Sequence, residues 1–486
     1  MRQGWEWRVG RREVNRGWRE LILLGLLAGC GWGSRSAAPS PSQVVLLVSL
    51  DTTRADHLGP YGHPEAVTPH LDQLASEGMV FERHIAAAPT TLASHTTLMT
   101  GNYPHTHGIS RNIYTVSSDN EMLAEVFEEE GWRTAAFLGA MPLQSASGFT
   151  QGFQHVDETF SRTRGRDLVD QAERGGDEVT DAVLSWIDGE GRGDGEPVFL
   201  FVHYFDPHAP YAPPEPYRSM YGDVTDPDAG SMKYVHKTRS LGKRGSERVA
   251  QRHAALQRLY LGEISWTDAQ LGRLVDGLKA RGWYDQAMVI VTADHGETQV
   301  GHSEVWNHGY TVYDETVRIP LLMRLPDSQR AGARVRRLVG NLDLYPTLLE
   351  WFSFAPRDVE GESFVPLLRG EAMAERAPVF SEATKPYVPQ GDSEWRNDLR
   401  KKSASSAGLK VHFDPMTEAW ELYDLTEDPD EADNLHRDED TSRGESLRRA
   451  LGQWRDEADP LPAPEQGSDQ TRRQLEALGY VDEGAE

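Results

Sequence analysis

The run Val44-Val45-Leu46-Leu47-Val48-Ser49 sets the fold class of this chain of 486 residues. Its first five residues are aliphatic, and an unbroken apolar run of this length is typical of a strand buried on both faces, as in a parallel sheet. Asp51 stands at the C-terminal end of the run. Functional sites form at this edge of open α/β sheets, so Asp51 is a candidate site residue as well as a candidate turn or cap residue.

Two further runs of the same kind follow along the chain, Val198–His203 and Ala287–Thr292. Asp206-Pro207-His208 follows the first run, and Asp294-His295-Gly296-Glu297 follows the second. Other periodic segments predict a helix from Pro69 to Gly78, a helix over 120–130, a strand over 133–138, and helices over 182–187 and 268–278. This alternation predicts an α/β sandwich with a mainly parallel central sheet. The polar residues 222–250 are interpreted as a surface excursion.

The composition sets the size of the core and excludes one class of partner. The chain is 38% hydrophobic, which suffices for one large domain and a smaller companion. Its formal net charge is −26. Binding of nucleic acid requires a surplus of Lys and Arg, so we expect no nucleic-acid partner.

The N-terminus has the pattern of a targeting segment. Six arginines precede a short apolar run, Leu21–Gly29, which is too short to span a bilayer because a spanning helix takes about 20 apolar residues. Leu27-Ala28-Gly29-Cys30 looks like a bacterial lipobox, in which the cysteine is acylated. We therefore predict a lipoprotein signal peptide over 1–29 and a tether over 30–43. The protein would then be anchored to a membrane through Cys30, in the bacterial cell envelope and outside the cytoplasm.

Cys30 is the only cysteine, so the chain has neither a disulfide framework nor a cysteine metal site. The alternative interpretation of Cys30 is an ordinary free thiol. Removal of residues 1–29 would remove six arginines and three glutamates and leave the mature chain near −29.

A segment rich in hydroxyl groups lies between the first two apolar runs. Residues 89–101, Pro-Thr-Thr-Leu-Ala-Ser-His-Thr-Thr-Leu-Met-Thr-Gly, hold six hydroxyl residues and one histidine. Thr90 or Ser94 is suited to cap a helix that begins near Ala93. The N–H groups and the dipole of a helix N-terminus favour anions, so a hydroxyl there is well placed to attack a phosphate or a sulfate. The alternative is an N-cap with no chemical role.

Four residues make a candidate ligand set for one divalent ion: Asp51, Thr91, Asp294 and His295. Carboxylate, hydroxyl and imidazole ligands favour Mn, Zn or Fe over Ca or Mg, which prefer oxygen ligands.

Four further histidines are candidates for contacts with a substrate anion or for proton transfer. His208 and His308 are favoured. His203 ends a strand, where a satisfied core histidine is the alternative, and His302 completes the set.

Several motifs recur in a fixed order across most of residues 44–486. They are Leu50–Gly59, Thr91–Gly101 with Tyr103-Pro104-His105, His203–Tyr211, Thr292–Glu297, Asn307–Tyr310, Val317–Pro320, Trp420–Leu425 with Asp428-Pro429 and Asn434-Leu435, and Leu475–Val481. By these motifs and their order, the chain resembles the sulfatase family of the alkaline phosphatase superfamily.

The resemblance implies an alkaline-phosphatase-like α/β catalytic domain, which we place at 44–372. It also implies a smaller α+β subdomain at 373–486, with a short antiparallel sheet and a helix. It places Asp51, Asp294 and His295 at the family's metal-ligand positions.

The chain departs from the family at the nucleophile. The usual motif is Cys-x-Pro-Ser-Arg before Leu-x-Thr-Gly, and this register puts Thr91 at the cysteine, Ala93 at the proline and His95 at the arginine. The family oxidises the cysteine to formylglycine, and threonine cannot undergo that change. A threonine oxygen can instead attack directly once a metal stabilises its alkoxide. Related branches with threonine nucleophiles handle phosphodiesters, phosphonates, and phosphoglycerol or phosphoethanolamine groups.

Two smaller departures concern the metal. Thr52 replaces the second aspartate that follows the first in many sulfatases, and Asp294-His295 replaces the Asp-Asn pair of calcium arylsulfatases. Both changes favour a transition metal.

Three functions remain open from the sequence. The leading hypothesis is a metal-dependent hydrolase of sulfate or phosphate esters, with Thr91 as the nucleophile and His95, His208 and His308 as further catalytic residues. Its substrate would be an anionic ester, including a sulfated or phosphorylated glycan. The alternatives are a transferase of phosphoglycerol or phosphoethanolamine type that acts on envelope glycans or lipids, and a non-catalytic anion-binding lipoprotein.

Overall fold

The structure is a computed structural model that describes residues 43–160, 173–191, 195–243, 245–302, 305–384, 400–436 and 442–457. The predicted signal peptide 1–29, the tether as far as residue 42, including Cys30, and the terminal motif Leu475–Val481 lie outside the described residues. In the described parts of the chain, no helix is both long enough and apolar enough to cross a membrane.

Three buried strands form the centre of the main sheet, as the apolar runs predict. β1 (Val44–Leu50) lies between β6 (Val198–Tyr204) and β7 (Ala287–Ala293) and pairs with both in parallel. The register aligns Ser49 of β1 with His203 on one side and with Thr292 on the other. The residues that follow the three strands therefore emerge at the same edge of the sheet.

The main sheet has eight strands in the order β10-β2-β9-β7-β1-β6-β4-β5. β4 and β5 continue it in parallel beyond β6, while β9 is antiparallel to both β7 and β2. The bounds of these outer strands are β2 Met79–Phe81, β4 Arg133–Phe137, β5 His155–Asp157, β9 Leu321–Arg324 and β10 Ala333–Val335. The sheet is therefore mixed but mainly parallel, and the predicted fold class is confirmed.

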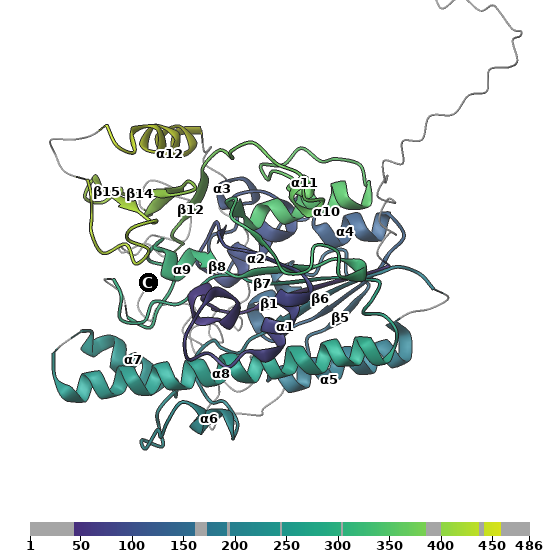
Figure 1. The fold of residues 1–486 in the computed structure, drawn as a ribbon, viewed down its shortest axis with the longest axis horizontal. Coiled ribbons are helices and arrows are strands. Elements are labelled where there is room, and N and C mark those ends of the chain that lie inside the picture. Colours follow the sequence, from purple (N-terminus) through teal and green to yellow (C-terminus); the bar gives the residue numbers. More distant parts are fainter. Residues whose placement is uncertain are drawn as a thin grey trace, which may run out of the picture. The chain divides into compact units, whose positions relative to one another are not determined.

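Helices cover both faces of this sheet (Figure 1). Alternate residues of β1 enter different hydrophobic clusters, with Val45 and Leu47 on one face and Val44, Leu46 and Val48 on the other. One face packs against α2 (Thr91–Thr100), α4 (Leu123–Glu129) and α10 (Leu344–Phe352). The other face packs against α1 (Pro69–Glu77), α5 (Gly176–Trp186) and α8 (Glu247–Ala280).

The interpretation of residues 222–250 as a surface excursion is wrong in part. This segment contains α7 (Met232–Leu241) and the start of α8, which is 34 residues long and includes the predicted helix 268–278 as its last third. Val249 and Leu256 are among the few apolar residues that the first part of α8 buries. The remaining face is charged, so the amphipathic signal there is weak.

The C-terminal region forms an antiparallel sheet with a helix, as the family resemblance implies. Its elements are β12 (Val379–Glu382), β13 (Lys402–Ser405), β14 (Leu409–Asp414), β15 (Ala419–Asp424) and α12 (Glu445–Glu457). The first strand is joined to the segment before α2, because the Glu382 N–H donates to the Ala87 carbonyl at 2.8 Å and Ser381 Oγ donates to the Ala86 carbonyl at 2.7 Å.

The described chain also contains shorter elements, which include several single-turn 3-10 helices. A sheet of three two-residue strands has the order β11 (Val339–Gly340), β3 (His84–Ile85) and β8 (Arg318–Ile319). The short helices are α3 (Pro104–His107), α6 (Tyr217–Met220), α9 (Asp314–Val317) and α11 (Val365–Leu368).

Candidate functional site

Asp51, Asp294 and His295 come together at the C-terminal edge of the main sheet. Asp51 directly follows β1, and Asp294 and His295 directly follow β7, its parallel neighbour. One side-chain atom from each of the three residues lies within 4.8 Å of the other two, and all three side chains are buried.

The outward atoms of this cluster have no hydrogen-bond partner. Asp51 Oδ2, Asp294 Oδ2 and His295 Nε2 are buried, and none of them makes a hydrogen bond with a described residue. His295 Nδ1 lies 2.8 Å from the Gly296 carbonyl, to which it can only donate, so Nε2 carries the lone pair. Three buried acceptors so close together are unfavourable unless a cation lies between them, and two carboxylates and an imidazole suit a divalent transition metal. These residues therefore fit the implied metal.

The inward oxygens of the two aspartates are held by Thr52. Its backbone N–H donates to Asp294 Oδ1 at 3.0 Å, and its hydroxyl donates to Asp51 Oδ1 at 2.7 Å. Thr52 has a φ of 54°, which is a strained conformation for a β-branched residue. This conformation lets one residue orient both carboxylates, a role that the sequence could not reveal.

Thr91, which the resemblance aligns with the family's nucleophile, is the first residue of α2. Its side chain is buried, and its Oγ1 makes no hydrogen bond with any described residue. The predicted start near Ala93 is therefore late by two residues. The predicted capping is also wrong, because Thr90 at the N-cap position makes no capping hydrogen bond and Ser94 lies inside the helix. The Asn112 side chain instead accepts from the Leu92 N–H at 2.9 Å.

Ser94 ties the first turn of α2 to Asp51, Asp294 and His295, which we call the metal cluster because they are candidate ligands for one metal ion. Its hydroxyl donates to the Asp294 carbonyl at 2.6 Å and accepts from Asn341 Nδ2 at 3.0 Å. Asn341 Nδ2 also donates to the Ser94 carbonyl at 3.1 Å, and Asn341 Oδ1 accepts from the Ala87 N–H at 3.1 Å. The first turn of α2, which begins at Thr91, is thus held to Asp294 and to Asn341, and Asn341 belongs to none of the motifs.

His95 lies behind Thr91, with both ring nitrogens engaged. Nδ1 donates to the Thr91 carbonyl at 2.8 Å, and Nε2 accepts from Ser49 Oγ at 2.8 Å. Nδ1 also lies 3.8 Å from Asp294 Oδ2. Burial lowers the pKa of His95 to about 4, so the ring is neutral near pH 7. These contacts give His95 a positioning role, while its catalytic role stays a prediction.

His203, His208 and His308 surround the cluster. His203 Nε2 lies 3.2 Å from Asp51 Oδ2, and neither ring nitrogen of His203 makes a hydrogen bond with a described residue, so this is not a satisfied core histidine. The His308 ring lies 4.5 Å from the His295 ring and 5.3 Å from the His208 ring, measured between centroids. Burial lowers the pKa of both His203 and His208 to about 4.

Comparison with known proteins identifies the family of this chain. The sequence profile described as Sulfatase matches residues 43–354. The chain belongs to the sulfatase family. A second profile, described as N-sulphoglucosamine sulphohydrolase, C-terminal, matches residues 303–456. Membership makes this chain an ester hydrolase of the sulfatase family, and this argues against the non-catalytic alternative.

Relatives of this sulfatase-family chain span nearly its whole length. The N-acetylglucosamine-6-O-sulfatase of Bacteroides thetaiotaomicron is 22% identical, over 84% of this chain and 85% of the relative. A solved structure in complex with its substrate D-glucosamine-2-N,6-O-disulfate has a TM-score of 0.69 at 19% identity, covering 86% of this chain and 98% of that one. The phosphonate monoester hydrolase of Agrobacterium radiobacter has a TM-score of 0.65 at 23% identity, covering 87% and 96%. These structures show the same fold.

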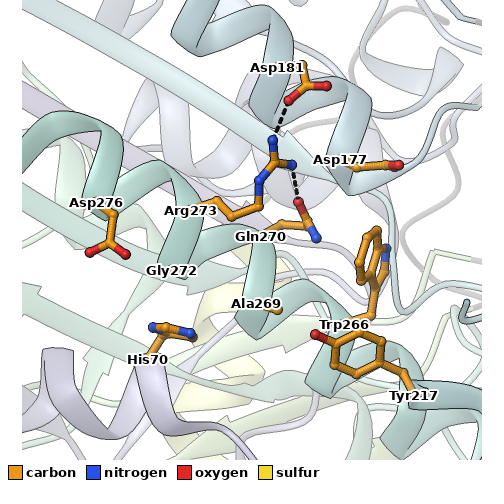
Figure 2. A pocket seen from close by; sticks show the side chains of 10 residues that line it. All are labelled: His70, Asp177, Asp181, Tyr217, Trp266, Ala269, Gln270, Gly272, Arg273 and Asp276. Carbon is orange, nitrogen blue, oxygen red and sulfur yellow. Dashed lines mark hydrogen bonds and ion pairs between the residues drawn. The ribbon is translucent and has the colours of Figure 1, made fainter. Parts of the chain in front are cut away.

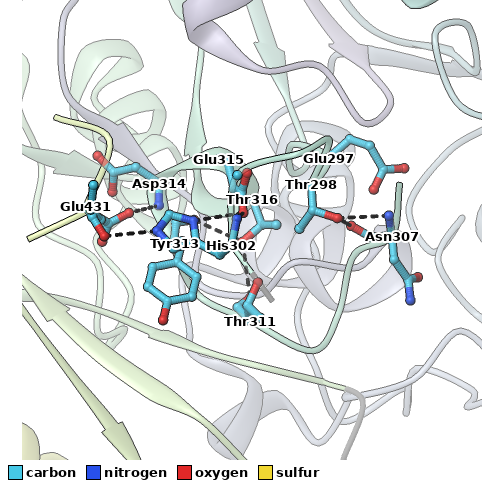
Figure 3. Close-up of polar contacts among 12 residues, drawn as sticks. Glu297, Thr298, His302, Asn307, Thr311, Tyr313, Asp314, Glu315, Thr316 and Glu431 are labelled. Atoms are coloured by element: carbon cyan, nitrogen blue, oxygen red, sulfur yellow. Dashed lines mark hydrogen bonds and ion pairs between the residues drawn. The ribbon is translucent and has the colours of Figure 1, made fainter. Parts of the chain in front are cut away.

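The structure does not bring His302 to the metal cluster. Its Nδ1 lies 3.0 Å from Glu315 Oε1, its Nε2 lies 3.0 Å from the Glu431 carbonyl, and its ring stacks on Tyr313 at 3.6 Å (Figure 3). Burial lowers the pKa of His302, but the hydrogen bonds to these two acceptors outweigh burial and raise the pKa overall. In this sulfatase-family chain, His302 therefore links the loop after β7 to the C-terminal region.

A cavity of about 600 Å³ lies among α1, α5, α6 and α8, away from the metal cluster. Arg273 crosses it between Asp181 and Gln270, and Tyr217 lies beside Trp266 (Figure 2). None of the residues that line it was predicted as a site residue, and none is a candidate metal ligand.

Proposed function

We propose that this chain is a metal-dependent hydrolase of sulfate or phosphate esters, with Thr91 as the nucleophile. Asp51, Asp294, His295 and Thr91 would hold one divalent ion, with Mn, Zn or Fe favoured by the mixed oxygen and nitrogen ligands. One observation carries the proposal: each of these four residues has a buried polar atom with no hydrogen-bond partner among the described residues.

A divalent ion, when bound, polarises the ester and lowers the pKa of a nearby hydroxyl. The chain's own residues supply the rest. The N-terminus of α2 favours a substrate anion, because its free N–H groups and dipole point toward that anion. The contacts of Ser94 with Asp294 and of His95 with Thr91 hold the attacking oxygen at a fixed position beside the carboxylates.

The first step would join Thr91 Oγ to the sulfur or phosphorus of the ester and break the bond to the leaving alcohol oxygen. The hydroxyl proton of Thr91 would pass to a nearby base, and the leaving oxygen needs a proton from an acid. His308 suits the acid role, because the Glu297 carboxylate lies 3.4 Å from its Nδ1 and stabilises positive charge on the ring. His208 is the candidate base. Attack by water on the Thr91 ester would then release sulfate or phosphate and restore the hydroxyl.

Two substrate classes have support, namely sulfated glycans and phosphorus esters. The relative named as an N-acetylglucosamine-6-O-sulfatase, together with the family itself, favours a sulfated glycan. The threonine and the likeness to a phosphonate monoester hydrolase favour a phosphorus ester. A formylglycine hydrate can expel its sulfate by elimination, whereas a threonine ester needs a second displacement.

We also propose that Cys30 is acylated, which would anchor the enzyme outside the cytoplasm. The lipobox pattern over 27–30 supports this location.

The test of the function compares Thr91→Ala, Thr91→Ser and the wild type on aryl sulfates, phosphodiesters and phosphonate monoesters. We expect Thr91→Ala to lose several orders of magnitude in kcat with a smaller change in KM, and Thr91→Ser to keep a measurable fraction. Thr91→Ala near the wild-type rate, in a folded protein, would remove Thr91 as the nucleophile. The preferred ester of the wild type then decides between sulfate and phosphorus chemistry.

A further inference from the structure

One segment of this acidic chain is strongly basic. We call α7 and the first part of α8, residues 232–258, the basic arm. It contains eight of the 50 Lys and Arg residues and one of the 76 Asp and Glu residues, Glu247, which leaves 42 basic and 75 acidic residues elsewhere. Its cations are Lys233, Lys237, Arg239, Lys243, Arg244, Arg248, Arg252 and Arg258, of which all but Arg244 are described.

The charges of the basic arm have no acidic partners in the described structure. Five cations are exposed, namely Lys233, Lys237, Lys243, Arg248 and Arg258, while Arg239 and Arg252 are half-buried. Among the described residues, none of these seven forms an ion pair with a carboxylate, whereas arginines nearby on α8 and after it do. Arg273 pairs with Asp181 at 2.5 Å, and Arg281 pairs with Asp188 at 2.5 Å.

The arm holds these charges on a rigid support. Lys233 and Lys237 are one helical turn apart on α7, as are Arg248 and Arg252 on α8, and like charges at this spacing destabilise a helix slightly. Arg252 joins the two helices, because its guanidinium lies 3.5 Å from the centre of the Tyr234 ring and donates to the Tyr234 carbonyl at 2.8 Å. Figure 1 shows α7 beside the first part of α8.

The basic arm contacts the loop that carries His308. Arg239 Nε donates to the Trp306 carbonyl, and Lys243 Nζ donates to the Gly301 carbonyl. Trp306 Nε1 donates to Nδ1 of His253 on α8 at 2.9 Å. His308 is two residues after Trp306, so the basic arm contacts the same loop as this candidate site residue.

We propose that the basic arm binds the polymer part of the substrate, a linear polyanionic glycan that carries several sulfate or phosphate groups. This inference rests on the proposed function, which places one ester group of the polymer at Thr91. Neighbouring anionic groups of the same polymer would then lie along α7 and α8. Charge complementarity supports it: the arm offers exposed cations without acidic partners, and such a polymer offers repeated anions.

An anionic membrane fits the arm less well. The exposed large hydrophobic residues of the described chain are Val67, Met220, Val300 and Met416, and none of them lies in the arm, so no apolar side chain is available for insertion. Charges are screened over about 8 Å at physiological salt. A narrow polymer can therefore respond to the arm alone, whereas a flat anionic surface also meets other parts of a chain whose net charge is −26.

The test measures binding of heparin, as a polysulfated probe, to full-length protein carrying Thr91→Ala. The arm variant is Lys233→Gln/Lys237→Gln/Arg248→Gln. The matched control is Arg336→Gln/Arg369→Gln/Arg449→Gln, which removes the same charge from exposed positions elsewhere. We expect the arm variant to bind at least tenfold more weakly at low salt. The slope of log Kd against log salt should fall by about two, since each lost contact removes roughly 0.7 to 0.9 in nucleic-acid systems.

Equal affinity of the arm variant and the wild type would overturn the proposal, and so would an equal loss in the control. A second experiment measures sedimentation of the Cys30→Ser protein, with and without the three arm substitutions, in the presence of phosphatidylserine vesicles. If the arm substitutions weaken vesicle binding but not heparin binding, the basic arm is a membrane contact and the proposal is overturned. The unfolding midpoint of each variant checks its fold. Binding is measured without turnover, so a failure here is distinct from a failure of Thr91 as the nucleophile.

Discussion

Ser94 offers a test of how this fold positions the nucleophile. The substitution Ser94→Ala removes the hydrogen bond of 2.6 Å to the Asp294 carbonyl and the bond of 3.0 Å from Asn341 Nδ2. It keeps the β-carbon, and Ser94 is fully buried, so the change is confined to the hydroxyl.

The expected cost in stability follows from these partners. A buried polar group that loses its partner costs about 1–3 kcal/mol. Asn341 Nδ2 keeps its bond of 3.1 Å to the Ser94 carbonyl, so the Asp294 carbonyl is the main group affected. We therefore expect the free energy of unfolding to fall by about 1–3 kcal/mol.

The expected effect on catalysis is larger. Thr91 lies one turn before Ser94 in α2, and the lost bond is a direct hydrogen bond between that turn and Asp294, a candidate metal ligand. Misplacement of a reacting group by about 1 Å can cost on the order of 10²-fold in rate. We expect kcat to fall by roughly 10- to 100-fold with a smaller change in KM, as measured by steady-state kinetics on the preferred ester.

Thr96→Val is the matched control. Thr96 is also buried in α2, and its hydroxyl donates to the Leu92 carbonyl at 2.7 Å, within the same helix. Its loss should cost about 0.5–1.5 kcal/mol of stability and leave kcat close to that of the wild type. If Ser94→Ala and Thr96→Val have the same kcat, the link from α2 to Asp294 does not position Thr91, and the reasoning fails.

Three further predictions concern the metal, pH and the membrane. Asp294→Asn with His295→Ala should remove the metal and abolish turnover without unfolding the chain, and full occupancy by elemental analysis would contradict the ligand assignment. The pKa of His302 is raised in the folded state, so its contribution to stability is complete below the unfolded pKa of about 6.5 and is lost as the pH rises through the folded pKa. The difference in unfolding free energy between the wild type and His302→Gln should therefore shrink with rising pH, and a constant difference would exclude this linkage. Cys30→Ser should move the protein from the membrane to the soluble fraction, and retention in the membrane would exclude the lipid anchor.

The central strands could be predicted from the sequence because burial on both faces requires an unbroken apolar run. β1, β6 and β7 satisfy that requirement, and their common direction brings Asp51, Asp294 and His295 to one edge. The start of α8 was missed because a helix that buries only one narrow face has few apolar residues, and the charged residues around them resemble those of a loop.

The supporting contacts of the site could not be predicted, because they join residues far apart in the sequence. Ser94 and Asn341 are 247 positions apart, and their contact depends on how α2 meets the segment after β11. Thr52 was recognised only as a departure from the family. Its positive φ, which lets it hold two carboxylates, follows from the tertiary structure and from no local pattern.

The net charge of −26 does not decide whether the chain can act on anions, because electrostatic recognition is local. At the site, the outward oxygens of two carboxylates have no hydrogen-bond partner among the described residues, and such a pair becomes attractive to an anionic ester only when a cation lies between them. At the surface, the basic arm concentrates positive charge within 27 positions, 232–258. The two features would bind different parts of a substrate. The metal cluster would bind a single ester group, and the basic arm would bind several anionic groups along a polymer. An acidic enzyme for anionic esters is therefore physically consistent, and removing the metal should affect every ester, whereas removing the arm's charges should affect only those that belong to a polyanion.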